Sequence, residues 1–234
     1  MTPVLKVLTE YCSIYVDDIN LSDLASDDPA LYGRRMWEYL RVAIPLFQIP
    51  PEMQEYLLGT ETNPKLTVPT YDSTTITLSG DSDSVDLGAD YKGYDICSCR
   101  VRSVNRAGDV ILTPIESSYD AETAIVTFST TIAGGTVLDF DLYKDGQFIE
   151  DLTPSIMNIL GICFQCVWQD RFNTDWLSIV SKVDDKSFSE QNRANKMRAD
   201  TERLNQVRRK LAEEMRRFSQ NLYYKQIVNN KIEI

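Results

Sequence analysis

The spacing of apolar residues divides the chain into two helical ends and a strand-like middle. Residues 2–16 place an apolar side chain at every third or fourth position, which predicts an amphipathic helix with Thr2 at its start and Pro3 at its first position. Residues 29–58 continue this spacing. They predict a second helix, which Pro45 ends or kinks, and a short third helix.

The middle of the chain, residues 65–152, has short runs of Thr, Val, Ile and Tyr that are separated by turns rich in Gly, Asp and Ser. Several short strands at this spacing predict a small antiparallel β-sandwich or barrel. Asp145-Gly146 predicts a hairpin, because both central residues of a two-residue turn favour positive φ. Cys97 and Cys99 fall in one predicted strand, so both thiols are expected on the same face.

Helical spacing returns after this region. Thr153 is expected to cap a helix in which Pro154 takes the first position. Nearly every position from Ile156 to Trp168 is apolar, which predicts a helix that is buried on all sides, inside the protein or inside an oligomer.

The three regions together predict an α+β protein with one inserted domain. Residues 1–64 form an N-terminal helical part, and residues 153–234 form a C-terminal helical part that packs with it. The small antiparallel β-sandwich or barrel of residues 65–152 is inserted between them.

The last predicted helix is long, because no Pro or Gly occurs from Ser189 to about Tyr224. Apolar residues recur in it with a heptad-like period, as in a coiled-coil seam. These seam residues are Met197, Leu204, Val207, Leu211, Met215, Phe218 and Leu222. Arginine and lysine fill the remaining faces, so the pattern predicts a packing helix with a basic outer face.

Charge is distributed unevenly along the chain, whose net charge is −11. Residues 1–185 hold 12 Lys and Arg against 29 Asp and Glu, whereas residues 186–234 hold 12 against 6. Three uses of the basic helix stay open: a solvated surface, contact with the acidic part of a neighbouring copy, and contact with nucleic acid. The acidic total and the lack of any helix-turn-helix or zinc-finger motif disfavour nucleic acid.

Catalytic chemistry has little support in the sequence. The chain contains no histidine, which removes the commonest general base and excludes a Ser-His or Cys-His triad. No phosphate-binding loop is present. We therefore expect a protein that is not an enzyme.

No metal or cofactor is expected either. Cys163 and Cys166, together with the earlier cysteine pair, offer four thiolates for zinc, but a pair within a buried helix is better explained as small apolar side chains. Asp81 and Asp83 resemble the start of a calcium loop that lacks its glycine and its final glutamate.

The sequence also predicts no signal peptide and no membrane-spanning segment, so no membrane partner is expected. Its five cysteines are expected to be free thiols in a reducing cytoplasm.

Residues 150–224 resemble the C-terminal part of small virion proteins of large tailed bacteriophages. In these proteins an "LT…I…LG…W" helix is followed by a "K-F…S-x-x-N" turn and a long basic helix that ends near aromatic residues. The matching residues are Leu152, Thr153, Ile159, Leu160, Gly161, Trp168, Lys186, Phe188, Ser189, Asn192, Tyr223 and Tyr224. The β-insert between helices is also similar to the layout of virion neck proteins.

The resemblance implies a structural protein of the head–tail connector, or neck, that is assembled in the host cytoplasm and located in the virion. Such an adaptor forms a homo-oligomeric ring of about twelve copies, joins the portal and head to the tail, and lets genomic DNA pass without sequence-specific contact. Its partners would be further copies, the portal and other neck or tail proteins. Another tail or baseplate role is the nearest alternative, and a nucleic-acid-binding protein is a more distant one.

Residues on the last two helices are the expected contacts with a partner or with other copies. They are Trp168, Met197, Leu204, Arg208, Arg209, Leu211, Arg216, Arg217 and Phe218.

Overall fold

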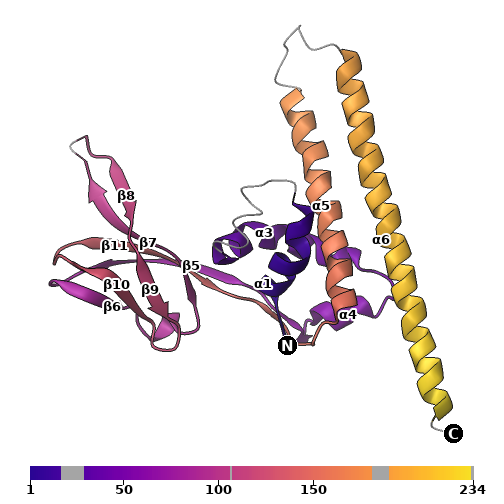
Figure 1. The fold of residues 1–234 in the computed structure, drawn as a ribbon, viewed down its shortest axis with the longest axis horizontal. Helices are drawn as coiled ribbons and strands as arrows, with labels where there is room; N and C mark the ends of the chain where they lie inside the picture. Colours follow the sequence, from indigo (N-terminus) through magenta and orange to yellow (C-terminus); the bar gives the residue numbers. More distant parts are fainter. Residues whose placement is uncertain (17–28, 106, 181–189, 233–234) are drawn as a thin grey trace.

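The structure is a computed structural model, and it describes residues 1–16, 29–105, 107–180 and 190–232 of the 234-residue chain (Figure 1). Side chains are not described for residues 29, 171–180, 190–197 and 224–232. The protein is of the mixed α+β class, with several antiparallel sheets. The helical elements are α1 (Val4–Val7), the π-helical turn η1 (Leu8–Cys12), η2 (Ser13–Tyr15), α3 (Pro29–Ala43), η3 (Ile44–Leu46), α4 (Met53–Leu58), η4 (Ala89–Tyr91), α5 (Pro154–Val180) and α6 (Glu190–Ile232).

Most strands lie in the middle of the chain, as the short runs of Thr, Val, Ile and Tyr predict. They are β1 (Thr2–Pro3), β2 (Gly59–Thr60), β3 (Asn63–Pro64), β4 (Leu66–Thr67), β5 (Thr70–Thr77), β6 (Ser82–Asp86), β7 (Asp95–Val104), β8 (Val110–Pro114), β9 (Ser117–Asp120), β10 (Ile125–Ile132), β11 (Val137–Lys144) and β12 (Gln147–Phe148).

One buried cluster joins the N-terminal helices to the C-terminal pair α5 and α6. It includes Leu8 of η1, Leu40 of α3 and Phe164 of α5, all fully buried. α5 begins as predicted, since Pro154 is its first residue and the Ile156 N–H points at the Thr153 hydroxyl, 3.4 Å away. From Ile159 to Trp168 every residue of α5 is buried or half-buried, because the N-terminal helices cover one side of it and α6 another.

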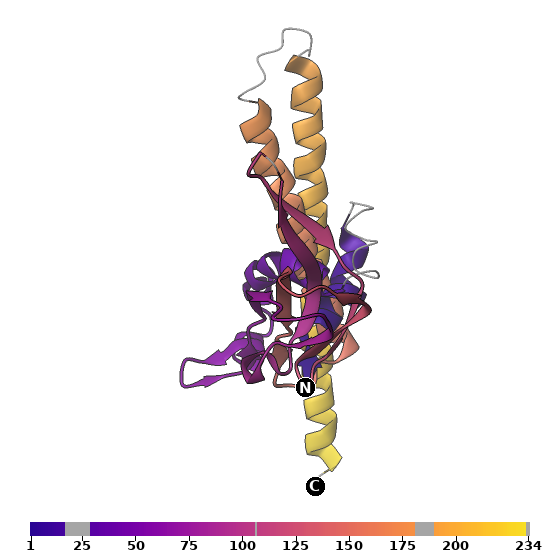
Figure 2. The ribbon, with the colours of Figure 1, turned by 90° about the vertical axis from the view of Figure 1, so that its left-hand side faces the viewer.

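A second buried cluster lies between a four-stranded sheet of order β5-β11-β7-β8 and a three-stranded sheet of order β6-β10-β9. In β11, Leu138, Phe140 and Leu142 are buried in this cluster, and Asp139 and Asp141 alternate with them on the other face. A further small sheet, β1-β12-β4, connects this region to the helices. Figure 2 shows the paired helices running behind the β region and extending beyond it.

The predicted hairpin at Asp145-Gly146 is wrong. β12 follows these two residues but pairs with β1 and β4 rather than turning back onto β11. Neither residue has positive φ. The glycine serves close packing instead, because a Cβ at Gly146 would lie 2.4 Å from the carbonyl oxygen of Thr67.

Two local expectations also fail. Cys97 and Cys99 do not share a face, because the β7–β11 register shifts by one residue between Asp141 and Leu142 and so changes the alternation. Cys99 is buried between the sheets, whereas on the far side of the register shift Ile96, and not Cys97, packs against the same cluster.

Thr2 belongs to β1 and not to a helix start, because it pairs with Phe148 of β12. Its hydroxyl also accepts a hydrogen bond from the Leu152 N–H at 2.8 Å. The N-terminal helical segment begins instead at Val4, and Pro3 precedes it.

Candidate functional site

The heptad-like seam of α6 is used inside the chain. Leu204, Val207, Leu211 and Met215 are buried. Phe218 lies at the end of this row, and its ring meets Phe47 edge-to-face at 5.7 Å between centroids. The apolar seam therefore belongs to the core of one copy. Met197 falls among the residues whose side chains are not described.

Trp168 also lies in the core. Its side chain is 1% exposed, it stacks on Phe164 at 6.2 Å, and it meets Tyr39 edge-to-face at 5.2 Å. The apolar members whose side chains are described, Trp168, Leu204, Leu211 and Phe218, thus pack against their own chain, and the arginines of the set are the members on the surface.

The four predicted arginines differ in their surroundings. The Nη2 atom of Arg208 lies 3.9 Å from Oδ1 of Asp170 in α5. The Nη1 atom of Arg217 lies 3.3 Å from Oε1 of Glu214, three residues earlier in α6. Exposed pairs of this kind contribute little to stability. Within the described part of the chain, Arg209 and Arg216 have no carboxylate at ion-pair distance.

We define the arginine row as Arg198, Arg209 and Arg216 of α6. The exposed ring of Tyr223 follows them on the same side of the helix. Successive members are separated by close to whole numbers of helical turns, so they line one side of α6, and all are exposed. Arg209 lies two residues from Val207 and two from Leu211, which places it about 200° around the helix axis from the buried seam. The row therefore faces away from α5.

The three-stranded sheet and its turns carry the opposite charge. We define the acidic surface as the seven exposed carboxylates of this region, which are Asp81, Asp83, Asp86, Asp90, Glu116, Asp120 and Glu122. Lys92 is the single basic residue in the same segments, 79–94 and 115–136. Several of these carboxylates accept hydrogen bonds from nearby backbone N–H groups, such as that of Gly134 to Asp81 at 2.8 Å. Among the described residues, none of the seven forms an ion pair.

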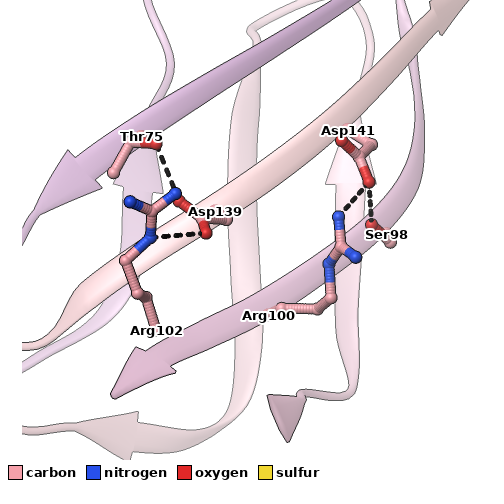
Figure 3. A network of polar contacts seen from close by, with 6 residues as sticks. All are labelled: Thr75, Ser98, Arg100, Arg102, Asp139 and Asp141. Atoms are coloured by element: carbon pink, nitrogen blue, oxygen red, sulfur yellow. Dashed lines mark hydrogen bonds and ion pairs between the residues drawn. The ribbon is translucent and has the colours of Figure 1, made fainter. Parts of the chain in front are cut away.

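The outer face of the four-stranded sheet holds two matched networks of hydrogen bonds and ion pairs (Figure 3). Asp139 accepts hydrogen bonds from Thr75 at 2.7 Å and from Arg102 at 2.8 Å. Burial disfavours the charged carboxylate of Asp139, but these hydrogen bonds outweigh it and lower its pKa below the usual value.

In the second network, Asp141 accepts hydrogen bonds from Ser98 and Arg100. The sequence signal for both networks is the alternation Asp-Phe-Asp in β11 and Arg-Val-Arg in β7, which the sequence reasoning missed. Since each aspartate is paired, these groups stabilise strand pairing and leave no reactive charge.

A half-buried carboxylate joins the β region to the N-terminal helices. Asp145 accepts hydrogen bonds from the Leu5 N–H at 3.1 Å and from the Tyr143 hydroxyl at 2.6 Å. Burial raises the pKa of Asp145, although its hydrogen bonds act in the opposite direction. Burial also raises the pKa of Tyr143, so its hydroxyl stays protonated and donates. This arrangement fixes the start of α1.

An apolar surface lies on the β7–β8 hairpin. Four aliphatic side chains are exposed there: Val104, Val110, Ile111 and Leu112. β8 is also an edge strand, and Pro114 at its end has no N–H to donate to a further strand. The Val-Ile-Leu run predicts a strand but not this exposure.

Four of the five cysteines are small buried groups, and Cys97 is half-buried. Cys163 and Cys166 of α5 are both buried and free, as is Cys12 of η1. Burial raises the pKa of Cys166 to about 11, so its thiol is protonated at neutral pH and unreactive. Over the described residues, no three His, Cys, Asp or Glu side chains are arranged to hold a metal ion, and no helix is long and apolar enough to cross a bilayer.

Compared with known protein families, with curated proteins and with solved structures, the chain gives no match.

Proposed function

We propose that the chain is a structural virion protein of a tailed bacteriophage that forms a ring in the head–tail connector and lets DNA pass between head and tail. The resemblance of residues 150–224 to small virion proteins is the starting point. The proposal includes an adaptor position next to the portal and a location in the virion.

The observation that carries the proposal is the placement of charge. The arginine row lies on α6, and the acidic surface lies on β6, β9, β10 and their turns; these two regions form opposite ends of the long axis of the molecule (Figure 1). A protomer with complementary ends binds its neighbours head to tail, and such contacts close into a ring when the rotation between copies allows it.

Two further features support a structural role rather than a catalytic one. The whole chain lacks histidine. Two aspartates of the four-stranded sheet are paired with arginines, Asp139 with Arg102 and Asp141 with Arg100. We propose no catalytic activity and no cofactor.

The fold fits an adaptor in which a β-sandwich of residues 65–152 is inserted into a helical body. In this proposal the helical body of residues 1–64 and 153–234 gives a rigid frame, and the inserted sandwich reaches away from it toward a neighbour.

The mass of the purified protein tests the ring. We expect a closed ring of about twelve copies in mass photometry and negative-stain images. A protein that is monomeric at micromolar concentration and in low salt would oppose the ring.

Nucleic-acid binding is the second candidate, and the exposed Arg209 and Arg216 are the observation that favours it. It predicts binding to duplex DNA that weakens steeply with added salt.

A further inference from the structure

We propose that the arginine row of α6 in one copy docks on the acidic surface of the three-stranded sheet in a second copy. This inference rests on the proposed function, because it names the two surfaces through which copies of the chain meet. It goes further in assigning the acceptor surface, which belongs to a part of the chain far from α6 in sequence.

Among the described residues of one copy, neither the arginine row nor the acidic surface takes part in an ion pair. Arg209 and Arg216 have no carboxylate at ion-pair distance among the described residues. On the acidic surface, Asp81, Asp86 and Asp120 accept hydrogen bonds from uncharged donors, which are the Gly134, Gly88 and Glu122 N–H groups and the Thr123 hydroxyl. Seven carboxylates against one lysine leave strong self-repulsion, which a cationic partner relieves.

The two charged surfaces lie far apart within one copy. α6 and the strands β6 and β10 lie at opposite ends of the long axis (Figure 1), so the two surfaces cannot meet in one copy. In a pair of copies they can meet in a heterologous contact, and the free surfaces at the two outer ends remain available for the next copy. The same contact can therefore repeat from copy to copy, and the assembly needs no additional binding surface.

The charges around the arginine row favour a second copy over nucleic acid as the partner. A polyanion that approaches the chain meets a net charge of −11. It also meets Glu202 and Glu213, which are exposed and flank the arginine row on α6. The acidic surface of a second copy presents separate carboxylates instead of a continuous charged backbone, and these can pair with single arginines.

The test uses two charge-reversal variants of the full chain. The helix variant is Arg209→Glu with Arg216→Glu, and the sheet variant is Asp90→Arg with Glu122→Arg. Among the described residues, neither the Asp90 nor the Glu122 carboxylate makes a hydrogen bond. The two residues lie close to each other, because the Gly93 N–H donates a hydrogen bond to the Ala121 oxygen between their segments. The self-association constant is measured by sedimentation or mass photometry in low and in high salt.

Each variant alone is expected to associate at least tenfold more weakly than the wild type, because like charges then face each other. An equimolar mixture of the two variants is expected to regain association, since both contacts in an alternating assembly are again complementary. A matched control, Lys6→Glu with Arg35→Glu, makes the same charge change on exposed positions of α1 and α3 and is expected to associate like the wild type.

The outcomes separate this inference from the proposed function. A ring that survives in both variants overturns the docking contact and leaves the ring in place. Charge-dependent association into open chains supports the contact and opposes the ring. Loss of duplex DNA binding in the helix variant, with unchanged self-association, overturns the contact and assigns the arginine row to nucleic acid. A mixture that stays dissociated also overturns it.

Discussion

The carboxylate of Asp145 accepts a hydrogen bond at 3.1 Å from the backbone N–H of Leu5, which lies 140 residues earlier in the chain. The first N–H groups of a helix have no partner within it, so this contact caps α1 from the far end of the β region. The neighbouring Val4 N–H donates to the Gly146 oxygen at 2.8 Å, which strengthens the same junction.

Replacing Asp145 should therefore destabilise the whole chain. Asp145→Ala leaves the Leu5 N–H and the Tyr143 hydroxyl without an acceptor, and we expect a loss of about 2 kcal/mol in the free energy of unfolding. Urea unfolding followed by circular dichroism measures it. Asp83→Ala, at an exposed carboxylate, is the control and should change stability by less than about 0.5 kcal/mol. Equal effects of the two changes would mean that the cap contributes nothing.

Asp145 and Asp139 should respond to pH in opposite directions. Burial raises the pKa of Asp145, so the stability that this group contributes is present at low pH and is lost as pH rises through the raised pKa. The pKa of Asp139 is lowered, because hydrogen bonds from Arg102 and Thr75 outweigh burial. Its contribution is present above the usual aspartate range and is lost as pH falls through the lowered pKa.

The measurement is the unfolding free energy of the wild type minus that of each Asn variant, from about pH 3 to about pH 7. We expect this difference to fall with rising pH for Asp145→Asn and to rise for Asp139→Asn. If both differences change with pH in the same direction, the raised pKa of Asp145 and the lowered pKa of Asp139 cannot both be correct.

Gly161 of α5 should not tolerate a side chain. A Cβ there would lie 2.6 Å from the backbone oxygen of Tyr11, so the N-terminal helical segment and α5 would have to separate. Gly161→Ala should lower the unfolding free energy by about 1–3 kcal/mol, although alanine favours a helix. Gly33→Ala is the comparison, because its closest contact is the end of the Leu5 side chain at 2.9 Å and its three nearest atoms include no backbone atom. Thermal unfolding should rank Gly161→Ala below Gly33→Ala, and the reverse order would contradict the packing argument.

Leu211 tests the buried seam. Leu211→Asp places a charge in the core between α6 and its neighbours, and we expect a loss of more than about 3 kcal/mol, or an unfolded chain. Gln206→Asp introduces the same charged residue on an exposed face of α6 and should leave the circular dichroism spectrum and the unfolding midpoint nearly unchanged. A stable, folded Leu211→Asp protein would show that the seam is not buried.

Features set by local spacing are predictable from the sequence. The seam at Leu204 and Leu211 and the end of α3 before Pro45 follow from periodicity and from the missing proline N–H. The arginines of α6 are predictable as surface residues for the same reason, since they fall between the seam positions.

Features that depend on distant partners are not predictable in this way. Asp145-Gly146 has the composition of a hairpin turn, but its conformation is set by contacts with Leu5 and Thr67. The face of Cys97 depends on a register shift against β11, which no local pattern reveals. The acidic surface is assembled from turns that are brought together only by the pairing of β6, β10 and β9.

The central claim is that the chain forms a ring in the neck of a phage particle, and a reconstruction of the purified particle by electron microscopy tests it most directly. We predict a ring of this fold between portal and tail, with α6 of one copy against the three-stranded sheet of the next. Particles in which this chain is absent, or in which it lies in the baseplate or the tail, would contradict the claim.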